Sequence, residues 1–96
     1  MAAETVVVTR HPSYVQYLES VGLIKSGCEV VGHATADTVA GKHVVTSGLP
    51  LHLAALAAKL TTVPLFLPAE LRGKELSLEE VAAHAQPPAS YVVSAA

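Results

Sequence analysis

The stretch Val6-Val7-Val8-Thr9-Arg10-His11-Pro12 decides the fold. Three consecutive β-branched valines are typical of a strand that is covered on both faces. Pro12 suits the first position of a following helix, because the N–H that proline lacks has no partner there. In an open parallel sheet, ligands bind just beyond the carboxyl ends of the strands. We therefore expect Thr9, Arg10 and His11 to lie in a binding crevice.

Composition indicates one small α/β domain. The chain has 96 residues, of which 51% are hydrophobic, with one Phe and no Trp. Such a chain has room for a single core, built here from Val, Leu, Ala and Ile between layers. The formal net charge of -2 excludes a globally basic surface of the kind that binds long nucleic acids.

Cysteine content and hydropathy favour a cytoplasmic protein with no membrane segment. Cys28 is the single cysteine, so no internal disulfide can form. No positively charged leader followed by an apolar run precedes the first predicted strand. The longest apolar run is interrupted by His52 and Lys59, well short of the roughly 18 residues that a membrane span needs.

Hydrophobic periodicity predicts alternating strands and helices. The strands are expected at residues 4–9, 29–34, 43–46, 63–67 and 90–93, and the helices at residues 12–21, 50–60 and 77–84, with one capped turn within residues 36–41 and a loop at 68–74. Thr35 or Asp37 is expected to cap the short turn, and Ser77 with Glu80 matches a capping box. We predict a mostly parallel sheet of four or five strands, with an order near 2-1-3-4.

A second corner repeats the design of the first. Thr46-Ser47-Gly48-Leu49-Pro50 places small polar groups, a glycine and a proline after the third predicted strand. Gly48 would let the backbone approach a ligand, and the N–H groups that open the helix expected at residues 50–60 would attract an anion. An ordinary tight turn explains the same residues equally well. The predicted strand order places the two corners side by side.

Arg10 and His11 are the strongest chemical signal. Arginine offers a planar fork to phosphate oxygens, and histidine transfers protons near neutral pH. The structural alternative is that Arg10 pairs with an acid such as Glu4 while His11 caps a neighbouring carbonyl. His52 either faces the same crevice or is a surface histidine. Arg72 either binds a phosphate, pairs with Glu75 or caps the helix expected at residues 77–84.

Two other site classes fit the sequence poorly. The remaining histidines (His33, His43 and His84) have no metal-ligand spacing with each other or with Cys28, so no metal site is expected. An Arg-His pair after a first strand also occurs in histidine phosphatases, but there a glycine follows it. Here Pro12 follows, and the chain is too short for the other catalytic segments of that fold.

Three blocks of the chain together resemble a small family of type III CRISPR-associated proteins regarded as stand-alone ring nucleases. The blocks are Val-Thr-Arg-His-Pro at residues 8–12, Gly-Leu-Pro-Leu-His-Leu-Ala-Ala at 48–55 and Leu-Pro-Ala-Glu-Leu-Arg-Gly-Lys-Glu-Leu at 67–76. The resemblance implies a small Rossmann-like fold and a homodimer that cleaves cyclic tetra-adenylate into linear di-adenylates. Thr9, Arg10 and His11 match the first family motif, and Glu70, Arg72 and Gly73 match the last.

The cleavage that this resemblance implies needs no metal or other cofactor. The ribose 2′-hydroxyl attacks the neighbouring phosphate in line, so the protein must fix that geometry and offset developing charge. Arg10 would hold phosphate oxygens, His11 would transfer protons or stabilise the leaving oxygen, and Ser47 would position the phosphate. The full expected ligand-binding set is Thr9, Arg10, His11, Pro12, Thr46, Ser47, Gly48, Leu49, Pro50, His52 and Arg72.

Two functions of other classes remain open from the sequence. One is a binding protein that sequesters the same cyclic oligoadenylate without cutting it, because positioning groups serve both tasks. The other is a regulatory or structural subunit in which the two corners are only well-capped turns.

Overall fold

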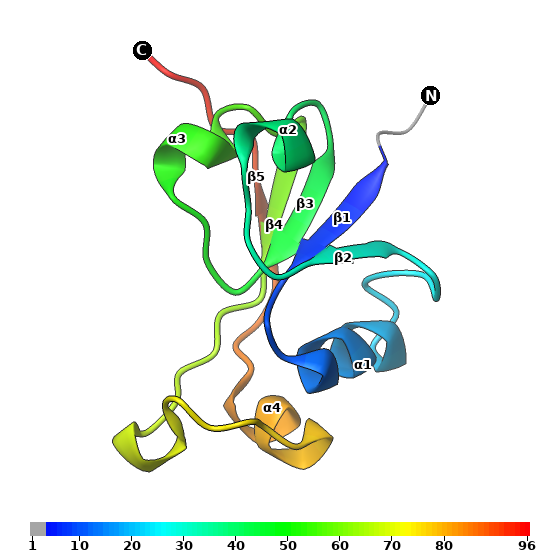
Figure 1. Cartoon of the computed structure of the whole chain (residues 1–96), viewed down its shortest axis with the longest axis vertical. Helices are drawn as coiled ribbons and strands as arrows, with labels where there is room; N and C mark the ends of the chain where they lie inside the picture. Colours follow the sequence, from blue (N-terminus) through cyan, green and yellow to red (C-terminus); the bar gives the residue numbers. More distant parts are fainter. Residues whose placement is uncertain (1–3) are drawn as a thin grey trace.

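A five-stranded, mostly parallel sheet forms the centre of the protein. The structure is a computed structural model that describes residues 4–96. The strands are β1 (Thr5–Val8), β2 (Glu29–Val31), β3 (His43–Thr46), β4 (Lys59–Thr62) and β5 (Ala89–Tyr91). Their spatial order is β2-β1-β3-β4-β5, and only the β4–β5 pair is antiparallel (Figure 1). The predicted α/β class and strand order are confirmed.

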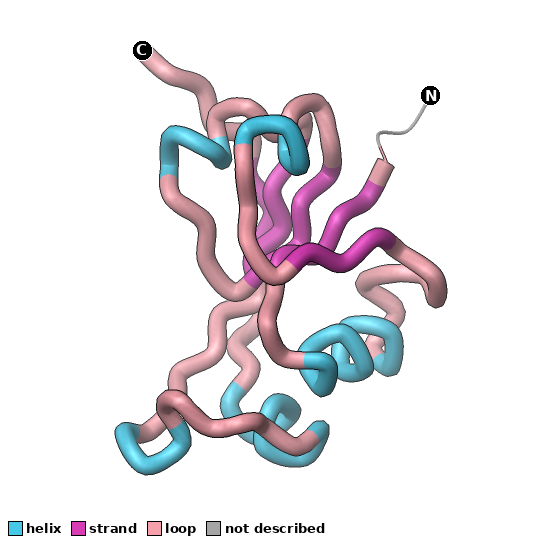
Figure 2. The backbone as a smooth tube through the Cα atoms, in the orientation of Figure 1, coloured by secondary structure: helices cyan, strands magenta, loops and turns pink. Residues whose placement is uncertain are grey.

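Helices flank the sheet in two groups. They are α1 (Pro12–Ser20), α2 (Ala36–Val39), α3 (Leu51–Ala54), α4 (Leu78–His84) and a short 3₁₀ turn, η1 (Ala69–Leu71). In Figures 1 and 2, α1 and α4 lie together at one end of the molecule, while α2 and α3 lie together near the other. No helix among residues 4–96 is long and apolar enough to cross a membrane.

Alternate residues of β1 serve two separate cores. Val7 is fully buried in a cluster that includes Tyr14 of α1 and Val81 of α4. Val6 is fully buried in a second cluster, with Val39 of α2 and others from the α3 side. Successive strand residues point to opposite faces, so a run of valines suits a strand that is covered on both sides.

A buried tyrosine joins the first core to the end of β4. The Tyr14 hydroxyl donates a hydrogen bond of 3.0 Å to the carbonyl oxygen of Val63. Burial raises the pKa of this phenol, so Tyr14 remains a protonated donor. The bond connects the first turn of α1 to a segment 49 residues further along the chain.

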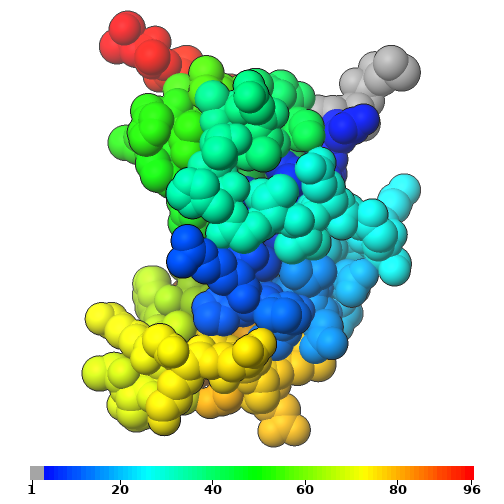
Figure 3. Space-filling model, viewed as in Figure 1, coloured from blue at the N-terminus to red at the C-terminus, as the bar shows by residue number. Residues whose placement is uncertain are grey.

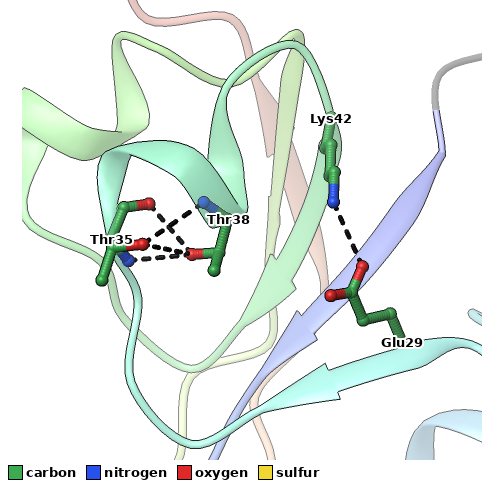
Figure 4. Close-up of polar contacts among 4 residues, drawn as sticks. All are labelled: Glu29, Thr35, Thr38 and Lys42. Carbon is green, nitrogen blue, oxygen red and sulfur yellow. Dashed lines mark hydrogen bonds and ion pairs between the residues drawn. The ribbon is translucent and has the colours of Figure 1, made fainter.

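Local capping explains where three helices begin. Pro12 is the first residue of α1, as predicted. Ser77 and Glu80 form the predicted capping box at α4, where the Ser77 N–H donates to Glu80 Oε1 over 2.9 Å and lowers the pKa of that carboxyl. Thr35 caps α2 through a reciprocal pair of bonds with Thr38 (Figure 4).

The helix predicted over residues 50–60 is wrong, and so is the strand predicted over 63–67. The helix ends at Ala54, and β4 occupies Lys59–Thr62. Pairing with β3 decides this segment, because Leu60 and Thr61 lie in register with Val44 and Val45 and are buried there. The periodicity of the Ala- and Leu-rich stretch cannot reveal such a long-range pairing.

Residues 63–67 form an irregular connection instead of a strand. Pro64 has no N–H to donate to a ladder, and its carbonyl accepts a 2.8 Å bond from the Gln86 N–H. A single isolated bridge joins Leu65 to Ala85.

Other differences are mainly shifts of element ends. The structure ends β2 at Val31 instead of residue 34, and β5 runs from Ala89 to Tyr91 instead of 90–93. The direction of this last strand, which the sequence leaves open, is antiparallel to β4. The loop at 68–74 contains η1.

Candidate functional site at the carboxyl ends of β1 and β3

The chain leaves β1 and β3 in opposite directions. The connection after β1 passes through α1 and returns to β2, whereas the connection after β3 passes through α3 and leads to β4. These two helices also pack in different cores. Such a reversal between neighbouring parallel strands opens a crevice beyond their carboxyl ends, the usual ligand site of open α/β sheets. Val8 and Thr46, the last residues of β1 and β3, are direct partners across this junction.

Backbone bonds fix the first corner and leave the His11 side chain available. The Thr9 N–H donates to the Val31 carbonyl over 2.9 Å, and the Thr9 hydroxyl accepts from the His11 N–H over 3.1 Å. His11 is the N-cap of α1, yet its side chain makes no capping bond. Its imidazole has no hydrogen-bond partner among the described residues, and the residue is partly exposed.

Arg10 lies against the end of β2. Its Nε donates a 3.2 Å hydrogen bond to the Gly32 carbonyl, and its Cγ lies 3.7 Å from where a Cβ on Gly32 would stand. Within residues 4–96 its two terminal nitrogens have no protein partner. One edge of the guanidinium therefore anchors the side chain while the other edge can donate to a ligand.

The structural alternative for the first corner finds no support in these contacts. Across the described part of the chain, Arg10 forms no ion pair with Glu4, and no carbonyl accepts a bond from the His11 ring. A 3.1 Å ion pair joins Lys42 to Glu29 at the opposite, amino edge of the sheet (Figure 4).

The second corner is held by a buried hydroxyl. Thr46 is 1% exposed, and its Oγ1 lies 2.8 Å from the Val8 carbonyl oxygen and 3.0 Å from that of Gly48. The Gly48 N–H donates back to the same hydroxyl over 3.3 Å. Thr46 therefore joins the two strand ends and shapes the turn. Ser47 and Gly48 are exposed beside it.

Two neighbouring cavities open at these corners. One of about 410 Å³ is lined by Thr9, Arg10, His11, Pro12, Val15, Gln16 and Val30. The other, about 400 Å³, is lined by Val8, Gly32, His33, Ala34, Gly48, Leu49, Pro50, His52 and Leu53. Because Arg10 bonds to Gly32, its side chain lies at the border between the two cavities. Most of the predicted ligand-binding residues are therefore brought together, but Ser47 and the buried Thr46 line neither cavity.

His33 is an additional candidate that the sequence reasoning considered only as a metal ligand. It lines the second cavity together with His52. Its position just after β2 is the signal that could have identified it, since β2 also ends at this edge of the sheet. No group of three or more His, Cys, Asp or Glu residues able to hold a metal ion occurs in residues 4–96.

Arg72 is not among the residues that line these two cavities. It lines a third cavity, with Leu65 to Pro68 and His84. Within the described part of the chain it makes no ion pair with Glu75. The cap of α4 is Ser77 instead of Arg72.

The short length of α3 corrects the expected anion site at its start. The helix has 4 residues, and its N-cap, Pro50, offers no N–H. A single turn aligns few peptide dipoles, so it attracts an anion less than the predicted eleven-residue helix would. Any phosphate at this corner must depend mainly on the exposed Ser47–Gly48 turn and on Arg10.

Comparison with known proteins gives one match. The family model described as "Putative CRISPR-associated protein (Cas_VVA1548)" matches residues 6–94. No curated protein and no solved structure matches the chain.

Proposed function

The chain belongs to this CRISPR-associated family, and from that premise we propose that it is a ring nuclease. Its substrate would be cyclic tetra-adenylate, bound between two copies of the chain and cut without metal to linear di-adenylate with a 2′,3′-cyclic phosphate. The reaction would switch off type III CRISPR signalling. The observation that supports this proposal is that Arg10 and His11 follow β1 while the Ser47–Gly48 turn follows β3, and the last residues of these two strands are partners.

The phosphate would be held from both sides of the crevice. The free edge of the Arg10 guanidinium can donate two hydrogen bonds to phosphate oxygens, and such charge-assisted bonds are stronger than neutral ones. The Ser47 hydroxyl can donate from the opposite corner. Because the Arg10 Nε is already bonded to Gly32, little side-chain freedom is lost on binding.

The cleavage step needs only alignment and proton transfer. The ribose 2′-oxygen forms a bond to phosphorus, its proton is accepted by a base, and the bond from phosphorus to the 5′-oxygen breaks as that oxygen gains a proton. The His11 imidazole is the side chain of the first corner that is suited to act as general acid or base. Arg10 would offset the negative charge that develops on the phosphate.

Two-fold symmetry would let a weakly charged protein bind four phosphates. A cyclic tetranucleotide can adopt two-fold symmetry, so each copy need supply only its own Arg10 and His11. Antiparallel pairing of two copies through the edge strands β2 or β5 would turn the two carboxyl edges to opposite ends of the joint sheet. The proposed dimer therefore uses a surface other than the sheet edges.

A cleavage assay tests the proposal directly. Purified protein is mixed with radiolabelled cyclic tetra-adenylate and excess chelator, and the products are separated on a gel. Linear di-adenylate ending in a cyclic phosphate is expected, at more than one turnover per protein chain. Unchanged substrate would refute the nuclease.

A second candidate function is sequestration of the same ligand without cleavage. One observation favours it: no partner within residues 4–96 orients the His11 imidazole, whereas catalytic bases are usually oriented by a third group. The two functions differ in the same assay. Tight binding with no product identifies the sequestering protein, whereas turnover identifies the enzyme.

A further inference from the structure

A third cavity, outside the two corners, lies beyond the end of β4. Its volume is about 570 Å³, and it is lined by Leu65, Phe66, Leu67, Pro68, Arg72 and His84. Small-molecule sites commonly have volumes of a few hundred Å³. Because β4 runs parallel to β1 and β3, the connection that forms this cavity leaves the sheet at the same carboxyl edge as the two corners. In Figure 3 this part of the chain (yellow) forms the end of the molecule below the start of α1 (blue).

Backbone bonds hold the rim of this cavity in place. The Phe66 N–H donates to the His84 carbonyl over 3.2 Å, and the Gln86 N–H donates to the Pro64 carbonyl over 2.8 Å. The bridge between Leu65 and Ala85 lies between these two bonds. An irregular segment is thus attached to the end of α4, so a ligand would meet a largely preformed site.

An aromatic ring and two potential cations meet at this rim. Phe66 is the single phenylalanine of the chain, and it is 68% exposed. Arg72 is exposed, and within the described residues its guanidinium has no ion-pair or hydrogen-bond partner. His84 is partly buried at the end of α4. An exposed aromatic ring stacks well on nucleobases, and arginine suits phosphate oxygens.

We propose that this cavity binds one nucleotide, with its base stacked on Phe66 and its phosphate held by Arg72 and His84. The apolar wall of Leu65, Leu67 and Pro68 would exclude water from the other parts of the base. The identity of the base rests on the proposed function: an adenylate of the cyclic substrate or of its linear product is the expected occupant. The binding itself does not depend on cleavage and can be measured alone.

The single phenylalanine provides a specific probe. The full chain is labelled with 4-fluorophenylalanine, which gives one fluorine resonance, at Phe66. Adenosine 5′-monophosphate is expected to shift this resonance in a saturable manner through the ring current of the stacked base. Ribose 5-phosphate and inorganic phosphate, which lack a base, are expected to leave it nearly unchanged. Absence of a saturable shift with adenosine monophosphate would overturn the proposal.

Variants separate the two contacts. Phe66→Leu is expected to weaken binding of radiolabelled adenosine monophosphate about tenfold in equilibrium dialysis, since a base–aromatic stack is lost. Arg72→Gln is expected to weaken it by about fivefold or more, through the lost phosphate contact. Tyr91→Leu and Lys74→Gln change an exposed aromatic and an exposed cation outside the cavity, and both should bind as the parent does. Equal weakening by the control variants would contradict the assignment.

The results also distinguish this site from the proposed nuclease. A saturable shift in a protein that leaves cyclic tetra-adenylate intact would support the nucleotide cavity and refute the nuclease. Cleavage of cyclic tetra-adenylate by a protein whose Phe66 resonance does not shift with adenosine monophosphate would support the nuclease and refute the nucleotide cavity. A resonance that changes only with protein concentration would assign Phe66 to contacts between copies and overturn the nucleotide site.

Discussion

The two corners at the carboxyl edge are alike in sequence and different in construction. In each, a threonine ends or follows a buried parallel strand and a proline comes a few residues later. Pro12 is the first residue of a 9-residue helix, whereas Pro50 is the N-cap of a helix of 4 residues. Among the described residues, the Thr9 hydroxyl accepts one bond, from the His11 N–H, whereas the Thr46 hydroxyl contacts the backbone of β1 at Val8 and of the turn after β3 at Gly48.

This difference indicates a division of labour between the corners. The first corner fixes its backbone with main-chain groups and the Thr9 hydroxyl, so the Arg10 terminal nitrogens and the His11 ring remain available to a ligand. The second corner uses its own threonine side chain to maintain the turn. Substitution of Arg10 or His11 should therefore change chemistry, whereas substitution of Thr46 should change stability.

The largest effect is expected from His11→Ala. Removal of a general acid or base typically lowers a rate by about 100-fold or more, so single-turnover cleavage of cyclic tetra-adenylate should fall by that amount. Affinity for cyclic tetra-adenylate should change by less than about threefold. The urea midpoint of unfolding should stay the same, because the His11 imidazole makes no capping bond. Unchanged cleavage would remove His11 from the mechanism.

Arg10→Gln should mainly affect binding. Loss of charge-assisted hydrogen bonds to phosphate is expected to weaken the binding of cyclic tetra-adenylate by about tenfold or more. Fluorescence anisotropy with a labelled non-cleavable ring would measure this change. Lys25→Gln, which removes an exposed cation from the connection between α1 and β2, is the matched control. Equal weakening in both variants would indicate nonspecific attraction.

Thr46→Val tests the scaffold role of the second corner. The substitution keeps the shape of the side chain but removes the partly buried hydrogen bonds of the Thr46 hydroxyl to Val8 and Gly48, so the free energy of unfolding should fall by about 1–3 kcal/mol. Urea denaturation measures it. Ser47→Ala, at the exposed neighbouring position, should change stability by less than about 0.5 kcal/mol. A stable Thr46→Val protein would contradict the division between the corners.

The smallest effect concerns acid stability, which we assign to neither corner. His43 Nε2 lies 2.7 Å from the Thr61 hydroxyl, which lies 2.9 Å from the Ser90 hydroxyl. This series of hydrogen bonds joins β3, β4 and β5. Burial, and then the charge of Lys59, lower the pKa of His43 below its ordinary value of 6.5. The unfolded chain therefore binds more protons, and stability is lost as the pH falls below that ordinary value.

His43→Gln measures this contribution. The variant should show a flatter dependence of the urea midpoint on pH between about 7 and 5 than the parent protein. The pH profile of cleavage above that range should be the same in both proteins. If His43→Gln instead shifts the pH profile of cleavage together with the pH profile of stability, the proton-sensitive group lies in the site.

Local sequence patterns predicted the parts of the fold that depend on neighbouring residues. The valines of β1 and Pro12 predicted a strand followed by a helix, and Ser77 with Glu80 predicted the start of α4. The rule that parallel strands share a carboxyl edge then predicted that the two corners lie together, and Val8 and Thr46 are indeed paired.

Long-range pairing determined what the sequence did not predict. Lys59–Thr62 continues an Ala- and Leu-rich pattern that is typical of a helix, but it forms a strand because β3 pairs with it. The nucleotide cavity depends on bonds between residues 64–66 and 84–86, which no periodicity reveals. For the same reason Phe66 and His84 were not candidates, and Arg72 was expected in the crevice.

The Tyr14 hydroxyl links the first corner to the connection that forms the third cavity. One phenol fastens the helix that starts beside His11 to the carbonyl of Val63, from which the chain proceeds toward Phe66. The first turn of α1 and the segment that leads to Phe66 therefore share one buried hydrogen bond. We therefore expect a ligand at one site to change the affinity of the other, and Tyr14→Phe, which removes this one hydrogen bond, to weaken that effect.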